Sequence, residues 1–118
     1  MPRYNLSDVH RLAASGCVIV VNRRARNNLL ELQWEISRLL VFLQCLKAKH
    51  FRGDRAQLSA FDGRRTVDAD KYSLRFDEES ETATTDQNCC EFFVELAVEV
   101  QPGGASLLIV SFHLDGQP

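Results

Sequence analysis

Apolar residues recur at helical spacing in the first half of the chain. Between about Arg24 and Lys49 they return every three or four positions, which places them on one helical face. This stripe consists of Leu29, Leu32, Ile36, Leu39, Leu43 and Leu46. It fits one long helix, or two helices with a bend near residues 31–33. A shorter helix is expected over residues 6–14, because the helix-start residue Asn5 precedes it and Gly16 follows it.

Strand patterns appear once before this stripe and again in the second half of the chain. Residues 17–21 form a β-branched apolar run, which is typical of a buried strand. In residues 90–101 every second position is apolar, which predicts a strand with one buried face. Residues 107–114 are largely apolar on both faces, as in a central strand. The sequence Pro102-Gly103-Gly104 predicts a hairpin turn between these two strands.

Two less regular segments precede this hairpin. Residues 66–76 alternate imperfectly, and residues 51–59 fit either a strand or a loop, with a turn signal at 61–63 between them. Residues 77–88 are acidic, polar and small, which predicts a flexible loop. The order of these elements predicts an α+β fold, with one domain over residues 1–118. In this fold the N-terminal helices pack on one face of a mostly antiparallel sheet of about four strands.

Composition narrows the setting of this domain. The longest apolar stretch, Leu39–Leu43, is too short to span a bilayer, and the first ten residues lack the apolar run of a signal peptide. We therefore expect a cytoplasmic protein without a membrane partner. Its four cysteines should be reduced and buried. They share no ligand-like spacing with the three histidines, so no metal or other cofactor is expected.

Charge is divided unevenly along the chain. Residues 1–75 hold all fourteen Lys and Arg together with seven Asp and Glu, a net charge of +7. Residues 76–118 hold nine Asp and Glu and no Lys or Arg, a net charge of −9. Such asymmetry favours an electrostatic partner. The alternative is that the two halves interleave in the fold, so that their charges mix on the surface.

Common catalytic motifs are absent from the sequence. There is no GxSxG, GxxxxGKS/T, GxGxxG or HExxH pattern. Asp68 and Asp70 share a strand face, where two carboxylates are able to bind a metal or to serve as acid and base. A solvated strand edge is the commoner origin of such a pair, because a DxD pattern alone is a weak signal.

A basic segment with interleaved aromatic residues is the strongest indication of a site. Its basic residues are His50, Arg52, Arg55, Arg64, Arg65 and Lys71, and its aromatic residues are Phe51, Phe61 and Tyr72. Guanidinium groups match phosphate oxygens in bidentate pairs, and aromatic rings stack on unpaired bases. A cation stabilises the pentavalent phosphate of RNA cleavage while a His, a Tyr or a carboxylate moves the protons. The alternative is that these arginines pair with the acidic loop at 77–88, which would then cover the site.

Both ends of the chain carry motifs of a known family. The opening Tyr4–Val9 (YNLSDV) leads into a helix, and Phe92–Leu96 and Leu108–Phe112 form the last hairpin. His50-Phe51, followed by a basic stretch, is similar to the segment that enters the family's active region. On these motifs the chain resembles the MqsR-type toxins of bacterial toxin–antitoxin systems, which share the RelE-like fold. The resemblance implies a metal-independent endoribonuclease that cleaves mRNA and is neutralised by a cognate protein antitoxin.

The same resemblance suggests roles for individual residues. Tyr72 matches the last position of the family's Trp-Gln-Asp-Val-Tyr strand motif, whereas Gly53 stands where the family has Lys. Arg52 or Arg55 is a candidate to replace that Lys, because either side chain can hold phosphate. The candidate catalytic residues are Tyr72, Arg55 and His50. The candidate RNA-binding residues are Arg52, Arg64, Arg65 and Lys71.

Two other functions also fit the sequence. A catalytically inactive relative would be a protein-binding module that uses the acidic loop at 77–88 and the strand residues Glu95 and Glu99. A metal-dependent hydrolase would instead use Asp68 and Asp70. The sequence does not define an oligomeric state.

Overall fold

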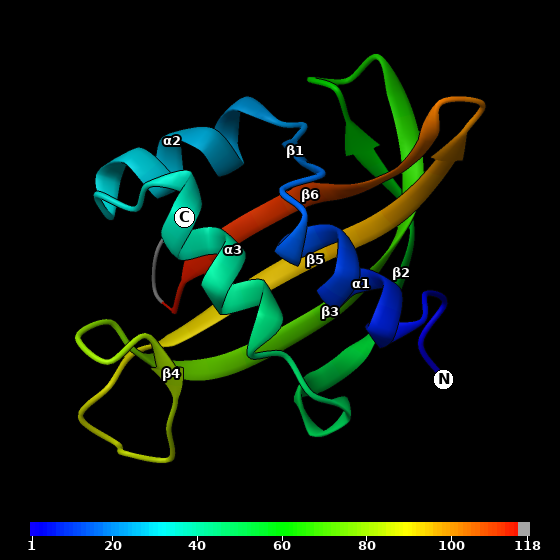
Figure 1. The fold of residues 1–118 in the computed structure, drawn as a ribbon. Coiled ribbons are helices and arrows are strands. Elements are labelled where there is room, and N and C mark those ends of the chain that lie inside the picture. The colour runs from blue at the N-terminus through cyan, green and yellow to red at the C-terminus, as the bar shows by residue number, and fades with distance from the viewer. Residues whose placement is uncertain (116–118) are drawn as a thin grey trace.

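The computed structural model of the chain describes residues 1–115 and shows helices packed against a curved sheet (Figure 1). The helices are α1 (Leu6–Ala14), α2 (Arg23–Glu31), α3 (Ile36–Gln44) and the short 3-10 helix η1 (Ala48–His50). The strands are β1 (Val18–Val20), β2 (Phe51–Ala60), β3 (Arg65–Asp77), β4 (Thr82–Ala83), β5 (Glu91–Gln101) and β6 (Gly104–Leu114). The predicted α+β class is confirmed.

The sheet contains six strands rather than about four. Its main path runs in the order β1-β6-β5-β3-β2, and β4 pairs with β3 beside this path. Only β1 is parallel to its neighbour, β6, and the other pairs are antiparallel. The predicted number was too low because the polar segment that begins at Phe51 is a strand and because residues 82–83, inside the expected loop, form the short β4.

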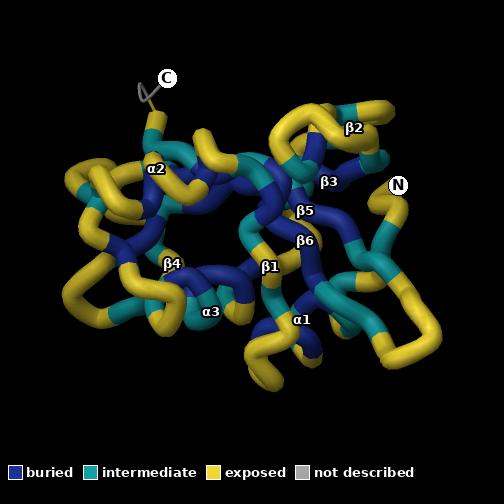
Figure 2. The backbone as a smooth tube through the Cα atoms, turned by 90° about the horizontal axis from the view of Figure 1, so that it is seen from above, coloured by how far each residue is buried: buried dark blue, intermediate teal, exposed yellow. Residues whose placement is uncertain are grey.

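Helices α1 and α3 lie across one face of the sheet, which we call the covered face (Figure 1). Alternate residues of the long strands point to this face, among them Tyr72, Leu74 and Phe76 of β3. Trp34, in the α2–α3 connection, stands at the centre of an aromatic cluster. Its ring centroid lies 4.8–5.7 Å from those of Phe42, Phe76, Phe92 and Phe112. The buried backbone therefore runs through the middle of the molecule, as Figure 2 shows.

The predicted helical stripe is divided between two helices. α2 ends at Glu31, and Gln33 has a φ of 60°, a left-handed conformation that an α-helix cannot continue through. α3 then begins at Ile36 with a new orientation. Ile36 is therefore 54% exposed although it belongs to the stripe, whereas Leu39 and Leu43 are fully buried.

Two asparagine side chains hydrogen-bond to the backbone carbonyls of β6 that lie beyond the end of β1. Because β1 pairs only with Leu107–Ile109, the later carbonyls of β6 have no strand beside them. The Asn22 side-chain amide donates to the Val110 carbonyl at 2.9 Å, and the Asn28 amide donates to the Phe112 carbonyl at 2.9 Å. α2 thus covers this edge, which protects it from pairing with another chain. Asn22 stands at the N-cap position of α2, but its side chain hydrogen-bonds to β6 rather than to its own helix.

A bulge at Val110 sets which residues face the other side of the sheet. Glu95 pairs with Ser111 whereas Leu96 pairs with Ile109, so Val110 is an extra residue in β6. After the bulge, Ser111 and His113 share a side with Phe93 and Glu95, and Phe112 stays in the aromatic core. We call this second side the open face, because α1 and α3 do not cover it.

Two sequence expectations about local structure were wrong. None of the cysteines is buried: Cys17 and Cys90 are exposed, and Cys45 and Cys89 are partly covered. The segment 77–88 is not wholly a loop, because it contains β4, whose Ala83 pairs with Phe76. Cys17 and Cys90 each stand just before a strand rather than inside one, which explains why they are exposed although apolar runs lie beside them.

Candidate nucleic-acid interface

A groove with a surplus of positive charge lies where η1, β3 and the start of β5 meet. Its volume is about 630 Å³. It is lined by Lys47, Lys49, His50, Arg52, Arg75, Ala83, Thr84, Thr85, Gln87 and Glu91. Four of these side chains are cations and one is a carboxylate, so we call it the basic groove. The space suits a short stretch of polyanion rather than a buried small molecule.

Local structure aims the cations of η1 and β2 at this groove. α3 ends at Gln44, and the chain turns through η1 directly into β2. The register of β2 against β3 slips between Phe51 and Gly53, so Arg52 is a bulged residue. A bulge redirects a side chain from the regular alternation. Arg52 is held there by hydrogen bonds from Nη1 to the carbonyls of Lys49 and Phe51, at 2.9 and 3.2 Å.

β3 and β5 supply the other wall of the basic groove. Arg75 and Glu91 are cross-strand partners on the open face. Arg75 Nη1 donates to the Cys89 carbonyl at 2.6 Å, and Glu91 Oε2 accepts from the Ser73 hydroxyl at 3.0 Å. The guanidinium and the carboxylate are therefore each held by a separate partner.

His50 is the buried group of the basic groove, with 8% of its surface exposed. Its Nδ1 accepts a hydrogen bond from the Lys47 backbone N–H at 2.9 Å. Burial, and then the charges of Lys49, Arg52 and Lys47, lower the pKa of the imidazole below its usual 6.5. The ring is therefore neutral at pH 7, and its proton is on Nε2 because Nδ1 is an acceptor. In this state His50 can donate a hydrogen bond from Nε2 but cannot accept a proton there.

The structure separates the predicted site residues into several places. His50 and Arg52 line the basic groove. Arg55 forms an ion pair with Glu95 at 3.4 Å, and Arg65 forms one with Glu99 at 2.5 Å. Lys71 lies with its Nζ 5.3 Å from the centre of the Phe93 ring. Arg64 is exposed in the β2–β3 turn, away from η1.

Tyr72 lies in the core rather than in the basic groove. It is 1% exposed and packs edge-to-face against Phe51, with ring centroids 5.6 Å apart. Burial, with a smaller contribution from the Asp70 charge, raises the pKa of its hydroxyl. Phe61, the third predicted stacking ring, lies under the Arg65 guanidinium at 4.3 Å. The aromatic residues of the basic segment therefore stabilise the fold, and the rings that the open face presents are Phe93 and His113.

The carboxylates of the acidic half are largely engaged within the fold. Glu78 and Glu81 each contact Arg38, at 3.4 and 3.5 Å, and Glu78 also accepts from the indole N–H of Trp34. Glu95 and Glu99 pair with arginines of the basic half. The alternative that the arginines of the basic segment pair with the acidic loop at 77–88 was wrong: Glu78 and Glu81 meet Arg38 of α3, and the glutamates of β5 meet Arg55 and Arg65. The loop does line one side of the basic groove, through Ala83, Thr84, Thr85 and Gln87.

Asp68 and Asp70 hold the N-terminal segment in place. Asp70 is fully buried, and its two oxygens accept from the backbone N–H groups of Arg3 and Tyr4, at 2.9 and 3.0 Å. Asp68 accepts from the Gln57 N–H at 2.9 Å. Within residues 1–115, no three His, Cys, Asp or Glu side chains come together as a group that could hold a metal ion.

The candidate site residues predicted from the sequence did not include four residues that line the basic groove: Lys47, Lys49, Arg75 and Glu91. Lys47 and Lys49 stand just before His50, whereas Arg75 and Glu91 lie in strand patterns and reach η1 only through the β3–β5 pairing. Comparison with protein-family models, curated proteins and solved structures finds no match for this chain. In the part of the chain that the structure describes, no helix is long and apolar enough to cross a membrane. A functional proposal therefore depends on the geometry of the basic groove.

Proposed function

We propose that this protein binds single-stranded RNA in the basic groove and acts as an mRNA-cleaving toxin whose partner is a protein antitoxin. The RNA-binding part rests on one observation: Lys47, Lys49 and Arg52 converge on a groove whose lining, among residues 1–115, contains one carboxylate, Glu91. A surplus of uncompensated cations in a concave surface attracts a polyanion. The cleaving and antitoxin parts rest on the family resemblance of the chain's two ends.

The groove offers the groups that phosphate recognition needs. Lys47 and Lys49 are exposed, so their ammonium groups remain free to meet phosphate oxygens. Arg52 keeps part of its guanidinium fork available beyond the two carbonyls that it contacts. His50 adds a neutral N–H donor, which can bind a phosphate oxygen. Recognition of this kind is sequence-tolerant, because it reads the backbone and not the bases.

For cleavage, Glu91 is better placed than Tyr72 to accept the proton of the 2′-hydroxyl. Glu91 lines the groove beside the cations, while Tyr72 is covered by Phe51. The Arg75 and Arg52 charges would stabilise the pentavalent phosphate that forms as the 2′-oxygen attacks. As the 2′-oxygen bonds to phosphorus, the P–O5′ bond breaks and the leaving 5′-oxygen takes a proton from water. The products are a 2′,3′-cyclic phosphate and a 5′-hydroxyl, and Glu91 returns its proton to the solvent.

RNA binding is tested with a labelled single-stranded RNA of about 12 nucleotides, a length that spans the groove with margin. The double variant Lys49→Gln, Arg52→Gln should bind at least about tenfold more weakly, and its slope of log affinity against log salt should fall by about 1.4, or 0.7 for each lost phosphate contact. The matched control Arg11→Gln, Arg23→Gln removes the same charge from outside the groove and should retain the wild-type slope. Equal losses in both doubles would contradict a specific groove.

Cleavage is tested separately by growth. Induction of the wild-type chain in bacteria should arrest growth, and Glu91→Gln should relieve the arrest while RNA binding in vitro persists. Normal growth with abundant folded protein would remove the toxin part and leave the RNA-binding part standing.

A further inference from the structure

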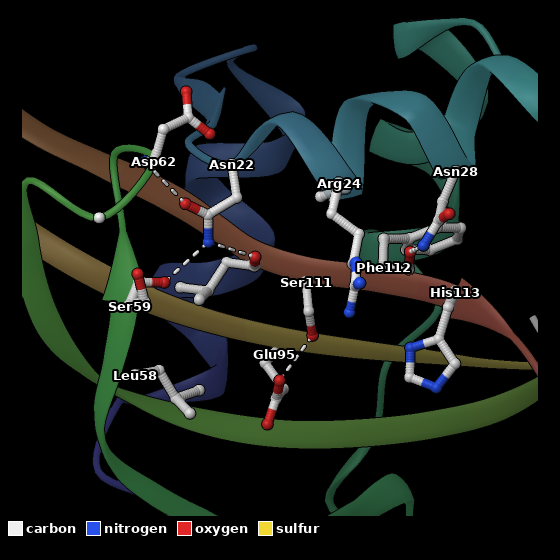
Figure 3. Close-up of a pocket in the computed structure, with 13 residues that line it drawn as sticks. Asn22, Arg24, Asn28, Leu58, Ser59, Asp62, Glu95, Ser111, Phe112 and His113 are labelled. Atoms are coloured by element: carbon white, nitrogen blue, oxygen red, sulfur yellow. Dashed lines mark hydrogen bonds between the residues drawn. The ribbon is translucent and has the colours of Figure 1, made fainter. Parts of the chain in front are cut away.

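A second cavity lies on the open face, between α2 and the tip of the β2–β3 hairpin (Figure 3). Its volume is about 610 Å³, which is in the range of small-molecule sites. Strand residues Glu95, Ser111 and His113 form its floor, and Leu58 and Ala25 provide apolar walls. We call it the α2 cavity. It shares no lining residue with the basic groove.

Most polar groups around the α2 cavity are already engaged. Asn22 donates to the Ser59 and Val110 carbonyls and accepts from the Asp62 N–H. The Asp62 carboxylate accepts from the Arg23 N–H and pairs with Arg26 at 3.2 Å. These contacts lower the pKa of Asp62, so its charge persists but is compensated. The hairpin is thereby fixed to the start of α2, and the cavity between them is a built feature of the fold.

Glu95 on the floor is compensated in the same way. Its Oε1 accepts from the Ser111 hydroxyl at 2.6 Å. Its Oε2 is buried without a hydrogen bond and faces Arg55 Nη1 at 3.4 Å. Because the Ser111 hydroxyl donates its proton to Glu95, its oxygen can only accept a hydrogen bond from a ligand.

Arg24 carries the one charge of the α2 cavity that no carboxylate among residues 1–115 compensates. It extends from the first turn of α2 toward the strand floor, between Ser111 and His113 (Figure 3). No ion pair or hydrogen bond joins its side chain to another of residues 1–115, whereas Arg26, half a turn further on, is paired with Asp62. With Asp62 and Glu95 each matched by an arginine, the uncompensated charge of the cavity is the single positive charge of Arg24.

His113 adds a flat surface beside this cation. Its ring stacks on Phe93, with centroids 5.1 Å apart and planes inclined by 10°. Lys71 contacts the same Phe93 ring. Burial and the Lys71 charge lower the pKa of His113, while Glu95 and Asp115 act in the opposite direction. The imidazole is therefore neutral at pH 7, so it offers a ring N–H and a planar surface for stacking.

We propose that the α2 cavity binds a small planar organic acid, whose anionic group meets Arg24 and whose ring lies between the His113 imidazole and the apolar wall at Leu58. A guanidinium pairs with a carboxylate or with a phosphate ester, so the shared chemistry is a flat apolar body with one anionic group. The site is independent of RNA binding in the basic groove. An acid of this kind would bind in the α2 cavity of the protein without RNA, because the Asn22 and Asp62 contacts already hold this cavity open.

Benzoate is the probe, and benzamide is its neutral isostere. In an amide-resolved NMR titration up to about 10 mM, where binding of a few kcal/mol is still detected, benzoate should shift Ala25, Ser111 and His113 to saturation. Benzamide should produce at least about tenfold weaker binding, because it lacks the charge that Arg24 recognises. Phenyl phosphate should displace benzoate from the same residues.

Two variants separate this proposal from simple surface charge. Arg24→Gln should weaken benzoate binding about tenfold or more, while Arg23→Gln, its neighbour outside the cavity, should leave it unchanged. The groove double Lys49→Gln, Arg52→Gln should also leave benzoate binding unchanged. Absence of shifts, equal binding of benzamide, or shifts centred on Lys49 and Arg52 would each overturn the proposal. Failure of RNA binding with intact benzoate binding would overturn only the groove function.

Discussion

The two faces of the sheet use the same strands in opposite ways. On β3, the covered face presents Tyr72, Leu74 and Phe76, while the open face presents Lys71 and Arg75. The covered face is closed by helices and an aromatic cluster. The open face holds charges, two concavities and a stacked Phe93–His113 pair. The covered face thus carries the larger apolar core, while the open face has a smaller apolar cluster, around Ala69, Ala97 and Leu108, and keeps its concavities available for ligands.

A second difference lies within the open face. Toward the β2–β3 turn, its arginines meet glutamates of β5, as in the pair of Arg65 with Glu99. Toward η1, the cations converge on a groove with one carboxylate. Exposed ion pairs contribute only about 0–1 kcal/mol to stability, so they are neither strong structural contacts nor free charges. Charge therefore indicates a binding site only where the fold leaves charged side chains without a partner of opposite charge.

The largest expected effect comes from the covered face. Trp34→Ala should lower the free energy of unfolding by about 3–5 kcal/mol, because it empties the centre of the aromatic cluster. Phe93→Ala, on the open face, should cost about 1–2 kcal/mol, because that ring is only half-buried. Urea unfolding followed by circular dichroism measures both. Equal costs would show that the two faces do not divide stability and binding.

Asp70 tests a charge placed on the covered face. By register it shares a side with Leu96, and it is fully buried. Asp70→Asn should cost about 1.5–3 kcal/mol in unfolding free energy, since hydrogen bonds from two backbone N–H groups to a carboxylate are weakened or lost. Asp54→Asn, which removes only the surface pair with Arg3, should change stability by less than about 1 kcal/mol. Faster amide exchange at Arg3 and Tyr4 in the Asp70 variant would identify the cause.

The smallest effect is a pH dependence of stability from the open face. The pKa values of His50 and His113 are lowered in the folded state, so the unfolded chain binds more protons below pH 6.5. The free energy of unfolding should therefore fall as the pH drops below about 6.5 and level off above it. The double variant His50→Gln, His113→Gln should flatten this slope in urea titrations from about pH 5 to 7.5. An unchanged slope would show that other titratable groups cause the pH dependence of stability.

Local patterns in the sequence determined several features of the fold. The alternation of residues 90–101 and the Pro102-Gly103 turn specify the β5–β6 hairpin, because strand periodicity and turn chemistry are local properties. Helical spacing likewise predicted the residues Leu39 and Leu43 that α3 buries, and the flanking residues Asn5 and Gly16 predicted α1. The charge division between the halves was visible too, along with the position of His50 and Arg52 in a basic segment.

Only the tertiary structure decided which charges remain free. Arg52 and Arg55 are three residues apart and chemically alike, yet one lines the basic groove and the other pairs with Glu95. The difference arises from the slip in the β2 register at Arg52 and from the pairing of strands distant in sequence. Burial of Asp70 and the approach of Arg75 to η1 have the same origin. The sequence determines the chemistry of each side chain, but whether its charge is compensated depends on neighbouring residues that only folding brings together.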